Sequence, residues 1–414
     1  MTAIQPPTDL QDERLRPAGA GARGQLKSLV DKLRGGDLGF LPVIVGLVII
    51  WSVFQALNPT FLSSRNLSNL LMQSVAVGVL ALGIVFVLLL GEIDLSVGSV
   101  SGLAAAIMAV YSVNNGWPLW AAIGAAIAVG VLIGFFYAAI YNIVGVPSFV
   151  ITLAGLLGFL GLQLFVLGPS GTINLPFDSP IVVFGQLAFV PQPIAYVLAV
   201  ATAAALAITQ IARSRGRAKA GLSAPSLTGI LIGAAVLAAV LVFVVFYLYD
   251  GARGIGWMVV LFVALVLIAN YALTRTSWGR SVFAVGGNRE AARRAGINVV
   301  RVYTSVFVIA STLAVVGGIL AAGRLAAASQ SSGAGDTNLN AIAAAVIGGT
   351  SLFGGRGSAF AALLGIIVIQ SITSGLTLLN MDPSIRYMVT GAVVLIAVSL
   401  DALARRSRRA HGRG

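Results

Sequence analysis

Uncharged windows of about twenty apolar residues recur along the chain, and they constrain its fold more than any other feature of the sequence. The first begins at Phe40 and the last ends near Leu403, while only 9% of the 414 residues are charged. About twenty apolar residues let a helix cross a hydrocarbon core of roughly 30 Å. Because alternating segments of about ten residues are not seen, the sequence predicts an all-α, polytopic transmembrane helical bundle rather than a barrel.

The basic residues predict how this bundle is oriented. Four segments, 1–38, 213–219, 275–301 and 405–413, hold 21 of the 26 Lys and Arg residues, and the positive-inside rule places all four in the cytoplasm. Because all four segments lie on the same side of the membrane, an even number of crossings must separate each one from the next. This gives about 10–12 membrane segments with both termini cytoplasmic. Spans are expected at 40–57, 70–91, 97–113, 119–143, 149–167, 191–212, 228–248, 257–273, 302–323, a short piece at 339–351, 358–379 and 386–403.

The same composition divides the chain into parts. A cytoplasmic N-terminal tail (1–38) shows no short apolar core with a cleavage site, so no secretory signal peptide is expected. The transmembrane domain covers 39–403, and a basic cytoplasmic tail follows at 404–414. Within the domain, 213–256 is a candidate two-helix insertion, and 274–301 is a charged cytoplasmic loop.

Residue usage excludes several chemistries. The chain has no cysteine, and its single histidine, His411, lies in the tail, which removes thiolate catalysis, disulfides, histidine relays and most zinc sites. The net charge of +13 follows the topology of the loops, so it indicates a lipid bilayer and not nucleic acid as the partner. No metal site is expected.

The stretch GEIDLSVGS (91–99) places two carboxylates, Glu92 and Asp94, at the join between two apolar spans. A carboxylate within a transmembrane helix costs about 2.5–3.5 kcal/mol on insertion scales, so it is usually paired, hydrated or functional. Two interpretations follow: Asp94 and its neighbours cap the next helix at the inner membrane edge, or the segment binds a ligand or gates a pathway. The candidates are Glu92, Asp94, Ser96 and Ser99.

The glycine-rich run GGTSLFGGRGS (348–358) lacks the lysine of a P-loop, so this chain is not expected to hydrolyse ATP itself. A tight turn between two closely packed helices explains it better, with Arg356 as an inner-face charge. The residues that could shape or gate a pathway here are Gly348, Gly349, Gly354 and Gly355.

The segment GRSVFAVGGNREAARRAGINVVR (279–301) predicts a short helix outside the bilayer. Asn288 can cap its start, and Gly296 can end it in a left-handed conformation. Such a helix suits docking to a soluble partner, although a solvated loop would also satisfy the charge rule. The residues singled out are Asn288, Glu290, Ala291, Arg293, Arg294 and Gly296.

These stretches, in this order, resemble the membrane-permease subunits of ATP-binding-cassette (ABC) importers for monosaccharides of the ribose and xylose type. The similarity carried by GEIDLSVGS, AVGGNREAARRAGINV and AAVIGGTSLFGGRGS extends from about Asn58 to Asp401. Glu92 departs from the pattern, since a small residue, usually glycine, is common there in the family. The length and the insertion at 213–256 resemble the xylose-type permeases.

The resemblance implies a type II-like ABC importer permease in the bacterial inner membrane, working as a homodimer. It would translocate a neutral monosaccharide, expected to be D-xylose, from an extracytoplasmic binding protein into the cytoplasm by alternating access. A separate cytoplasmic ATP-binding subunit would use ATP and Mg and contact the segment from Asn288 to Gly296. The permease would then bind no cofactor directly and would not be an enzyme.

Other functions remain as alternatives. An ion-coupled secondary sugar transporter could use Glu92 and Asp94 to bind a proton or sodium ion. A membrane enzyme acting on a lipid-linked sugar is disfavoured by the missing cysteine and by the absence of a separated pair of acids. A structural scaffold would not require the ordered motifs. Ion-driven uptake by the isolated protein, against dependence on cassette subunits, separates the first alternative from an ABC permease.

Overall fold

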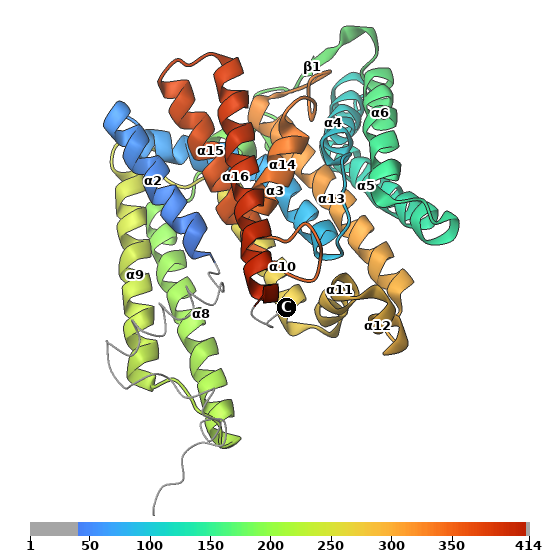
Figure 1. Ribbon diagram of the computed structural model, residues 1–414. Coiled ribbons are helices and arrows are strands. Elements are labelled where there is room, and N and C mark those ends of the chain that lie inside the picture. The colour runs from blue at the N-terminus through green and yellow to red at the C-terminus, as the bar shows by residue number, and fades with distance from the viewer. Residues whose placement is uncertain (1–39, 411–414) are drawn as a thin grey trace, which may run out of the picture. The chain divides into compact units, whose positions relative to one another are not determined.

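A computed structural model describes residues 40–410, so the predicted N-terminal tail and residues 411–414 lie outside the described part (Figure 1). The described backbone is helical apart from one pair of short strands. Nine of its helices are long and apolar enough to cross a membrane, and two shorter apolar helices, α2 and α14, accompany them. The predicted class, a polytopic transmembrane helical bundle, is therefore confirmed.

The elements follow one another in chain order as helices joined by short connections. Three of the described helices continue into π-helical turns: α4 through Val110–Asn114, α5 through Ile140–Val144 and α7 through Val183–Leu187. The helices are α2 (Leu41–Leu57), α3 (Ser64–Leu89), α4 (Val97–Ala109), α5 (Leu119–Ala139), α6 (Ser148–Leu167), α7 (Pro180–Val182), α8 (Gln192–Lys219), α9 (Leu227–Tyr249), α10 (Trp257–Arg275), α11 (Ser277–Gly287), α12 (Arg289–Arg294), α13 (Val299–Leu325), α14 (Thr337–Ile347), α15 (Phe360–Leu378) and α16 (Pro383–Ala410).

The chain forms two compact units, and residues 190–255 belong to the smaller one. There α8 packs on α9. Ser226 caps α9 by accepting a hydrogen bond from the Gly229 amide (3.1 Å). The two ends of the segment 190–255 meet where the Val190 amide donates to the Ile255 carbonyl (2.9 Å). The helix α8 runs on to Lys219, past the end of the span expected at 191–212, and takes in the basic segment 213–219. Arg and Lys are good helix formers and are favourable near a helix C-terminus. The two-helix insertion itself stays a prediction.

The larger unit is built around α3, α4 and α13, whose side chains are mostly buried. The helix α13 packs on α3, α4 and α5, while α14 and α15 pack on α3. Small residues permit this: a Cβ on Gly318 of α13 would overlap the backbone of Ser101 on α4. Without a hydrophobic driving force between helices in lipid, such close backbone approach is a main source of helix association.

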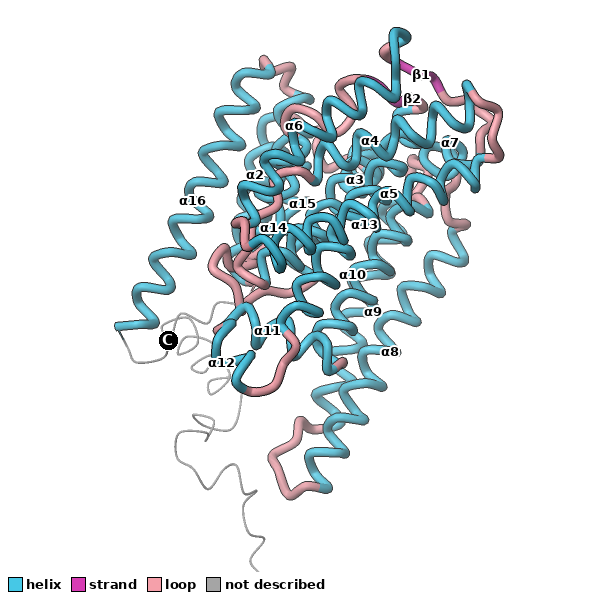
Figure 2. The backbone as a smooth tube through the Cα atoms, turned by 90° about the vertical axis from the view of Figure 1, so that its right-hand side faces the viewer, coloured by secondary structure: helices cyan, strands magenta, loops and turns pink. Residues whose placement is uncertain are grey.

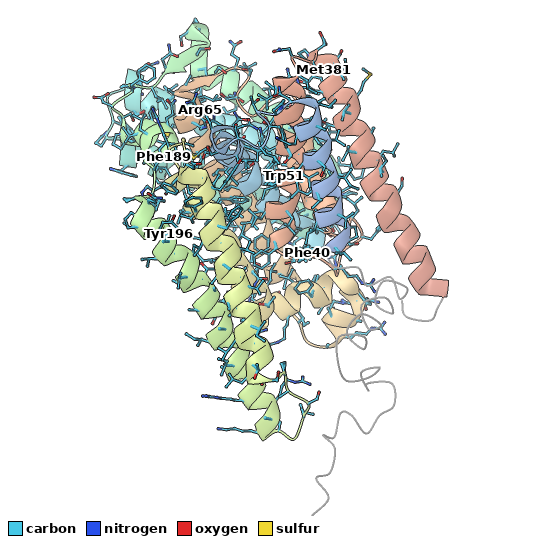
Figure 3. All side chains as sticks on the ribbon, turned by 90° about the vertical axis from the view of Figure 1, so that its left-hand side faces the viewer. Phe40, Trp51, Arg65, Phe189, Tyr196 and Met381 are labelled. Atoms are coloured by element: carbon cyan, nitrogen blue, oxygen red, sulfur yellow. The ribbon has the colours of Figure 1, made fainter. Side chains whose placement is uncertain are left out.

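Helix α2 packs on α15 in the same unit. The Trp51 indole donates a hydrogen bond to the Ser371 hydroxyl (2.9 Å), and Figure 3 labels Trp51 midway along α2. Phe40, just before α2, lies toward the end of the unit that carries α11 and α12, whereas Arg65 and Met381 lie toward the other end (Figure 3).

The two ends of the larger unit differ in structure. At one end β1 (Thr172–Asn174) pairs antiparallel with β2 (Ala327–Ser329), with Ile173 opposite Ala328. Helices α11 and α12 lie at the opposite end (Figures 1 and 2). The helix α11 was not expected from the sequence, although Thr276 accepts a hydrogen bond from the Gly279 amide (3.1 Å) as its cap.

Candidate functional site: a junction of three motifs

The first motif lies in the break between α3 and α4. Gly91 follows α3 with φ +79°, a left-handed conformation that glycine adopts most readily. The Asp94 side chain is only 2% exposed, and its Oδ1 accepts hydrogen bonds from the amide and the hydroxyl of Ser96, both at 2.7 Å. Ser96 begins α4, so the carboxylate lies near the partially positive end of that helix. The Asp94 carboxylate therefore closes a hydrogen-bonded turn directly before α4, while Ser96, the N-cap of that helix, makes no side-chain cap hydrogen bond.

Further hydroxyl groups surround the same helix start. The Tyr137 hydroxyl donates to Ser96 Oγ (2.7 Å), and Ser99 Oγ donates to the Ser96 carbonyl (3.0 Å). Tyr137 lies on α5 and is 1% exposed. A chain of hydrogen bonds therefore runs from α5 through Ser96 to Asp94, and it satisfies one of the carboxylate oxygens inside the protein.

Glu92 has a different environment from Asp94. Its Oε1 accepts from the hydroxyls of Tyr141 (2.5 Å) and Tyr303 (3.2 Å), and its Oε2 accepts from the Ser148 hydroxyl (2.5 Å). These partners come from the π-helical turn after α5, from α13 and from the start of α6. One carboxylate thus joins three helices to the break between α3 and α4.

The glycine-rich run forms the connection between α14 and α15. Gly349, Gly354 and Gly355 have φ values of +99°, +81° and +71°, so the run is a turn that L side chains would strain. A Cβ on Gly348 would overlap the carbonyl oxygen of Ala361 on α15. The predicted tight turn between closely approaching helices is therefore present.

The three motifs meet at one place, which we call the motif junction: Leu89, Gly91, Gly286, Gly354 and Gly355. The Gly355 amide donates to the Leu89 carbonyl (2.8 Å). A Cβ on Gly286 would overlap that carbonyl, and a Cβ on Gly354 would lie 2.5 Å from the Gly286 carbonyl and 2.9 Å from the Gly91 amide. Only glycines allow the end of α3, the end of α11 and the glycine-rich turn to share this space.

Helix α12 follows the junction directly. Asn288 Oδ1 accepts from the Ala291 amide (2.9 Å), and Gly296 has φ +83°, so the short capped helix predicted from the sequence is present. Ala292 is 3% exposed and holds the helix against the unit, whereas Ala291 faces outward.

The outward surface of α12 carries one acidic and three basic side chains, Arg289 among them. Glu290 pairs with Arg293 (2.9 Å) and with Arg294 (3.2 Å), and all of these side chains are at least half exposed. The hydrogen bond from Arg293 holds the pKa of Glu290 below its usual range, and the pKa of Arg293 is raised in turn. Exposed pairs of this kind contribute little stability, so these side chains are free to serve another surface.

The structure brings some of the predicted residues together and leaves others apart. Gly354 and Gly355 reach the junction, while Gly348 and Gly349 lie at the α14 end of the turn. Gly91, Gly286, Tyr141, Ser148 and Tyr303 were not predicted. Within the described residues, no three His, Cys, Asp or Glu side chains gather into a possible metal site.

The fold and this site define a class. A bundle of membrane-spanning helices with broken helices near one end, and with a capped helix outside the bundle at that same end, is typical of an integral membrane permease.

Comparison with known proteins identifies the family. Residues 66–398 match the family described as branched-chain amino acid transport system / permease component. The chain is 36% identical to the xylose transport system permease protein XylH of Escherichia coli (strain K12), over 94% of this chain and 96% of that one. It is 30% identical to the ribose import permease protein RbsC of Bacillus subtilis (strain 168), over 88% and 94%. It is 28% identical to the fructose import permease protein FrcC of Rhizobium meliloti, over 92% and 90%.

The chain therefore belongs to the permease-component family of ABC transport systems, within its sugar-importing members. A permease component provides the membrane passage and is not itself catalytic. No solved structure matches this chain.

Proposed function

We propose that this chain is the permease of an ABC importer that carries D-xylose into the bacterial cytoplasm. The observation that carries the substrate assignment is the 36% identity to the Escherichia coli xylose permease over nearly the whole of both chains, against 30% and 28% for the ribose and fructose permeases. A neutral sugar needs hydrogen-bonding groups rather than fixed charges, and the sparsely charged spans are compatible with that.

The orientation follows from charge. We place the end that carries α11 and α12 in the cytoplasm, because 21 of the 26 Lys and Arg residues lie in the four segments assigned to that side. Both chain termini would then be cytoplasmic, in an inner membrane. The side of β1 and β2 would face the binding protein that delivers the sugar.

The partners follow from the same assignment. A cytoplasmic subunit would bind ATP with Mg and dock on α12, whose exposed Glu290, Arg293 and Arg294 offer charges of both signs. Closure of that subunit on ATP would move α12, and the motif junction would pass the movement to α3 and to the turn before α15. Two copies of the permease would enclose the pathway.

The roles of the motif residues divide by their contacts. Asp94, Ser96 and Ser99 would hold the start of α4, and Gly354 and Gly355 would keep the turn against α3. An ion-binding role for Glu92 and Asp94 receives less support, because both carboxylates already accept hydrogen bonds from several protein groups.

Uptake of labelled sugar tests the proposal. Vesicles containing this protein with its co-purifying partners are given labelled xylose or labelled ribose, with ATP present or withheld. ATP-dependent uptake of xylose in preference to ribose is expected. Ribose uptake alone would reject the substrate, and uptake by the isolated protein on an ion gradient would reject the ABC mechanism.

A further inference from the structure

We propose that Glu92 and Arg289 hold the Tyr141–Tyr303 pair between them, and that this tyrosine cluster links α12 to the break between α3 and α4. Glu92 is then a positioning residue for coupling. The inference rests on the proposed function and deepens it, because it names the contacts through which movement of the docked helix reaches the membrane-spanning helices.

The two tyrosines form the centre of the cluster. Their rings stack with centroids 4.5 Å apart and planes 26° apart. Tyr141 belongs to the π-helical turn at the end of the α5 span, and Tyr303 belongs to the start of α13. Single π-helical turns are rare and frequently mark functional positions. This turn carries Tyr141 at the end of α5, beside the ring of Tyr303.

Arg289 reaches the pair from α12, of which it is the first residue. Its guanidinium carbon lies 5.5 Å from the Tyr141 ring centroid and 5.2 Å from that of Tyr303, which is cation–π distance. Its Nη1 also donates to the Tyr141 hydroxyl (3.2 Å), which in turn donates to Glu92. A chain of hydrogen bonds therefore connects the cation on α12 to the carboxylate in the helix break.

Glu92 and the residue after it also form hydrogen bonds with the start of α6. Ser148 donates to Glu92 Oε2 and also accepts from the Ile93 amide (3.4 Å), and Thr152 donates to the Ile93 carbonyl (3.3 Å). The segment after Gly91 is thus attached to the start of α6. Because Ile93 and Glu92 are bonded to the same helix start, a displacement of Glu92 would also act on the segment after Gly91.

The positions of these groups favour a role in transmitting movement of α12 to the helix break over a role in packing alone. Arg289 is exposed, so it lies where a docked subunit would displace it, while Tyr303 is 2% exposed and Ser148 is 4% exposed. Glu92 accepts hydrogen bonds from the hydroxyls of Tyr141, Tyr303 and Ser148, so one carboxyl group sets the orientation of three donors from different helices. The cluster therefore forms a second connection, beside the motif junction, from the exposed helix to the break between α3 and α4.

The test uses the reconstituted importer with its ATPase and binding protein, and it measures ATP hydrolysed per xylose imported. Glu92→Gln and Tyr303→Phe are each expected to raise this ratio about fivefold, the lower end of ordinary allosteric coupling, with basal ATPase activity retained. Arg289→Ala is expected to raise the ratio by a similar factor. The double variant Glu92→Gln/Arg289→Ala should be no worse than the stronger single one. The control Tyr271→Phe, on an exposed tyrosine of α10, should match the unmodified protein.

A second measurement tests the connection between α12 and Glu92 without measuring transport. In the isolated permease, Glu92→Gln should speed amide hydrogen exchange in α12 about fivefold, although residue 92 lies outside that helix. Arg289→Lys should restore part of the protection that Arg289→Ala loses. Unchanged exchange in α12, or multiplied effects in the double variant, would overturn the proposal. Absence of ATP-driven uptake in the unmodified protein would instead reject the proposed function, and the exchange result would still decide whether the link exists.

Discussion

Substitution of Gly286 by alanine should damage the motif junction, whereas the same change at the adjacent Gly287 should not. A Cβ on Gly286 would overlap the Leu89 carbonyl and lie 2.9 Å from the Gly355 amide, which are the two partners of a 2.8 Å hydrogen bond. A Cβ on Gly287 would meet nothing within 4 Å. The two glycines therefore form a matched pair.

The cost of Gly286→Ala can be worked from these contacts. Overpacking of a well-packed site costs about 1–3 kcal/mol, and loss of the hydrogen bond between Gly355 and Leu89 adds about 1 kcal/mol. The sum is roughly 2–4 kcal/mol. At about 2 °C per kcal/mol for a large chain, Tm of the purified permease should fall by about 4–8 °C.

The assay is thermal unfolding of the detergent-purified variants, followed by ATP-driven xylose uptake. Gly286→Ala should lower both Tm and the uptake rate. Gly287→Ala should keep the Tm of the unmodified protein or raise it slightly, because alanine is the better helix former. Equal Tm values for the two variants would refute the argument that the three motifs meet through glycine contacts.

Three further predictions concern α12 and the smaller unit. Asn288→Ala should cost about 1 kcal/mol of local helix stability and speed hydrogen exchange in α12, while Asn288→Asp should keep the cap. Equal exchange in the two variants would contradict a capping role for Asn288. Because the pKa of Glu290 is lowered, its stabilising effect on α12 is present at neutral pH and is lost as pH falls through that lowered value. The protection of the α12 amides, measured as their exchange rate relative to the intrinsic rate at the same pH, should therefore fall only in acid, and Glu290→Gln should abolish that fall. Replacing residues 190–255 by a short glycine linker should leave the C-terminus on its original side of the membrane in a reporter-fusion assay. The reason is that Phe189 and Gly256 already pair and that two crossings are removed together. A reporter on the opposite side would contradict the removal of an even number of crossings.

The membrane-spanning helices could be predicted from the sequence because hydropathy depends on local composition. The span expected at 257–273 is observed as Trp257–Arg275, and the one expected at 302–323 as Val299–Leu325. The short helix after Asn288 was also predictable, since its cap and its terminating glycine lie within nine residues of each other along the chain. Local signals sufficed for both.

The environment of Glu92 could not be predicted in the same way. Its partners Tyr141, Ser148 and Tyr303 lie 49, 56 and 211 positions away, and no local pattern distinguishes them from other tyrosines and serines. The need for glycine at position 286 could not be predicted for a similar reason, because it arises from the close approach of the Leu89 carbonyl. Both depend on which helix ends meet, and that is decided by packing across the whole unit.

The number of ATP molecules hydrolysed per xylose imported tests the central claim most directly, when it is compared between the unmodified importer and the variant Glu290→Ala/Arg293→Ala/Arg294→Ala. These side chains lie on the exposed surface of α12 and pair with one another, so the permease should still insert and fold. We expect the partner still to hydrolyse ATP while xylose uptake falls and the ratio rises severalfold. An unchanged ratio would show that α12 does not couple ATP hydrolysis to transport.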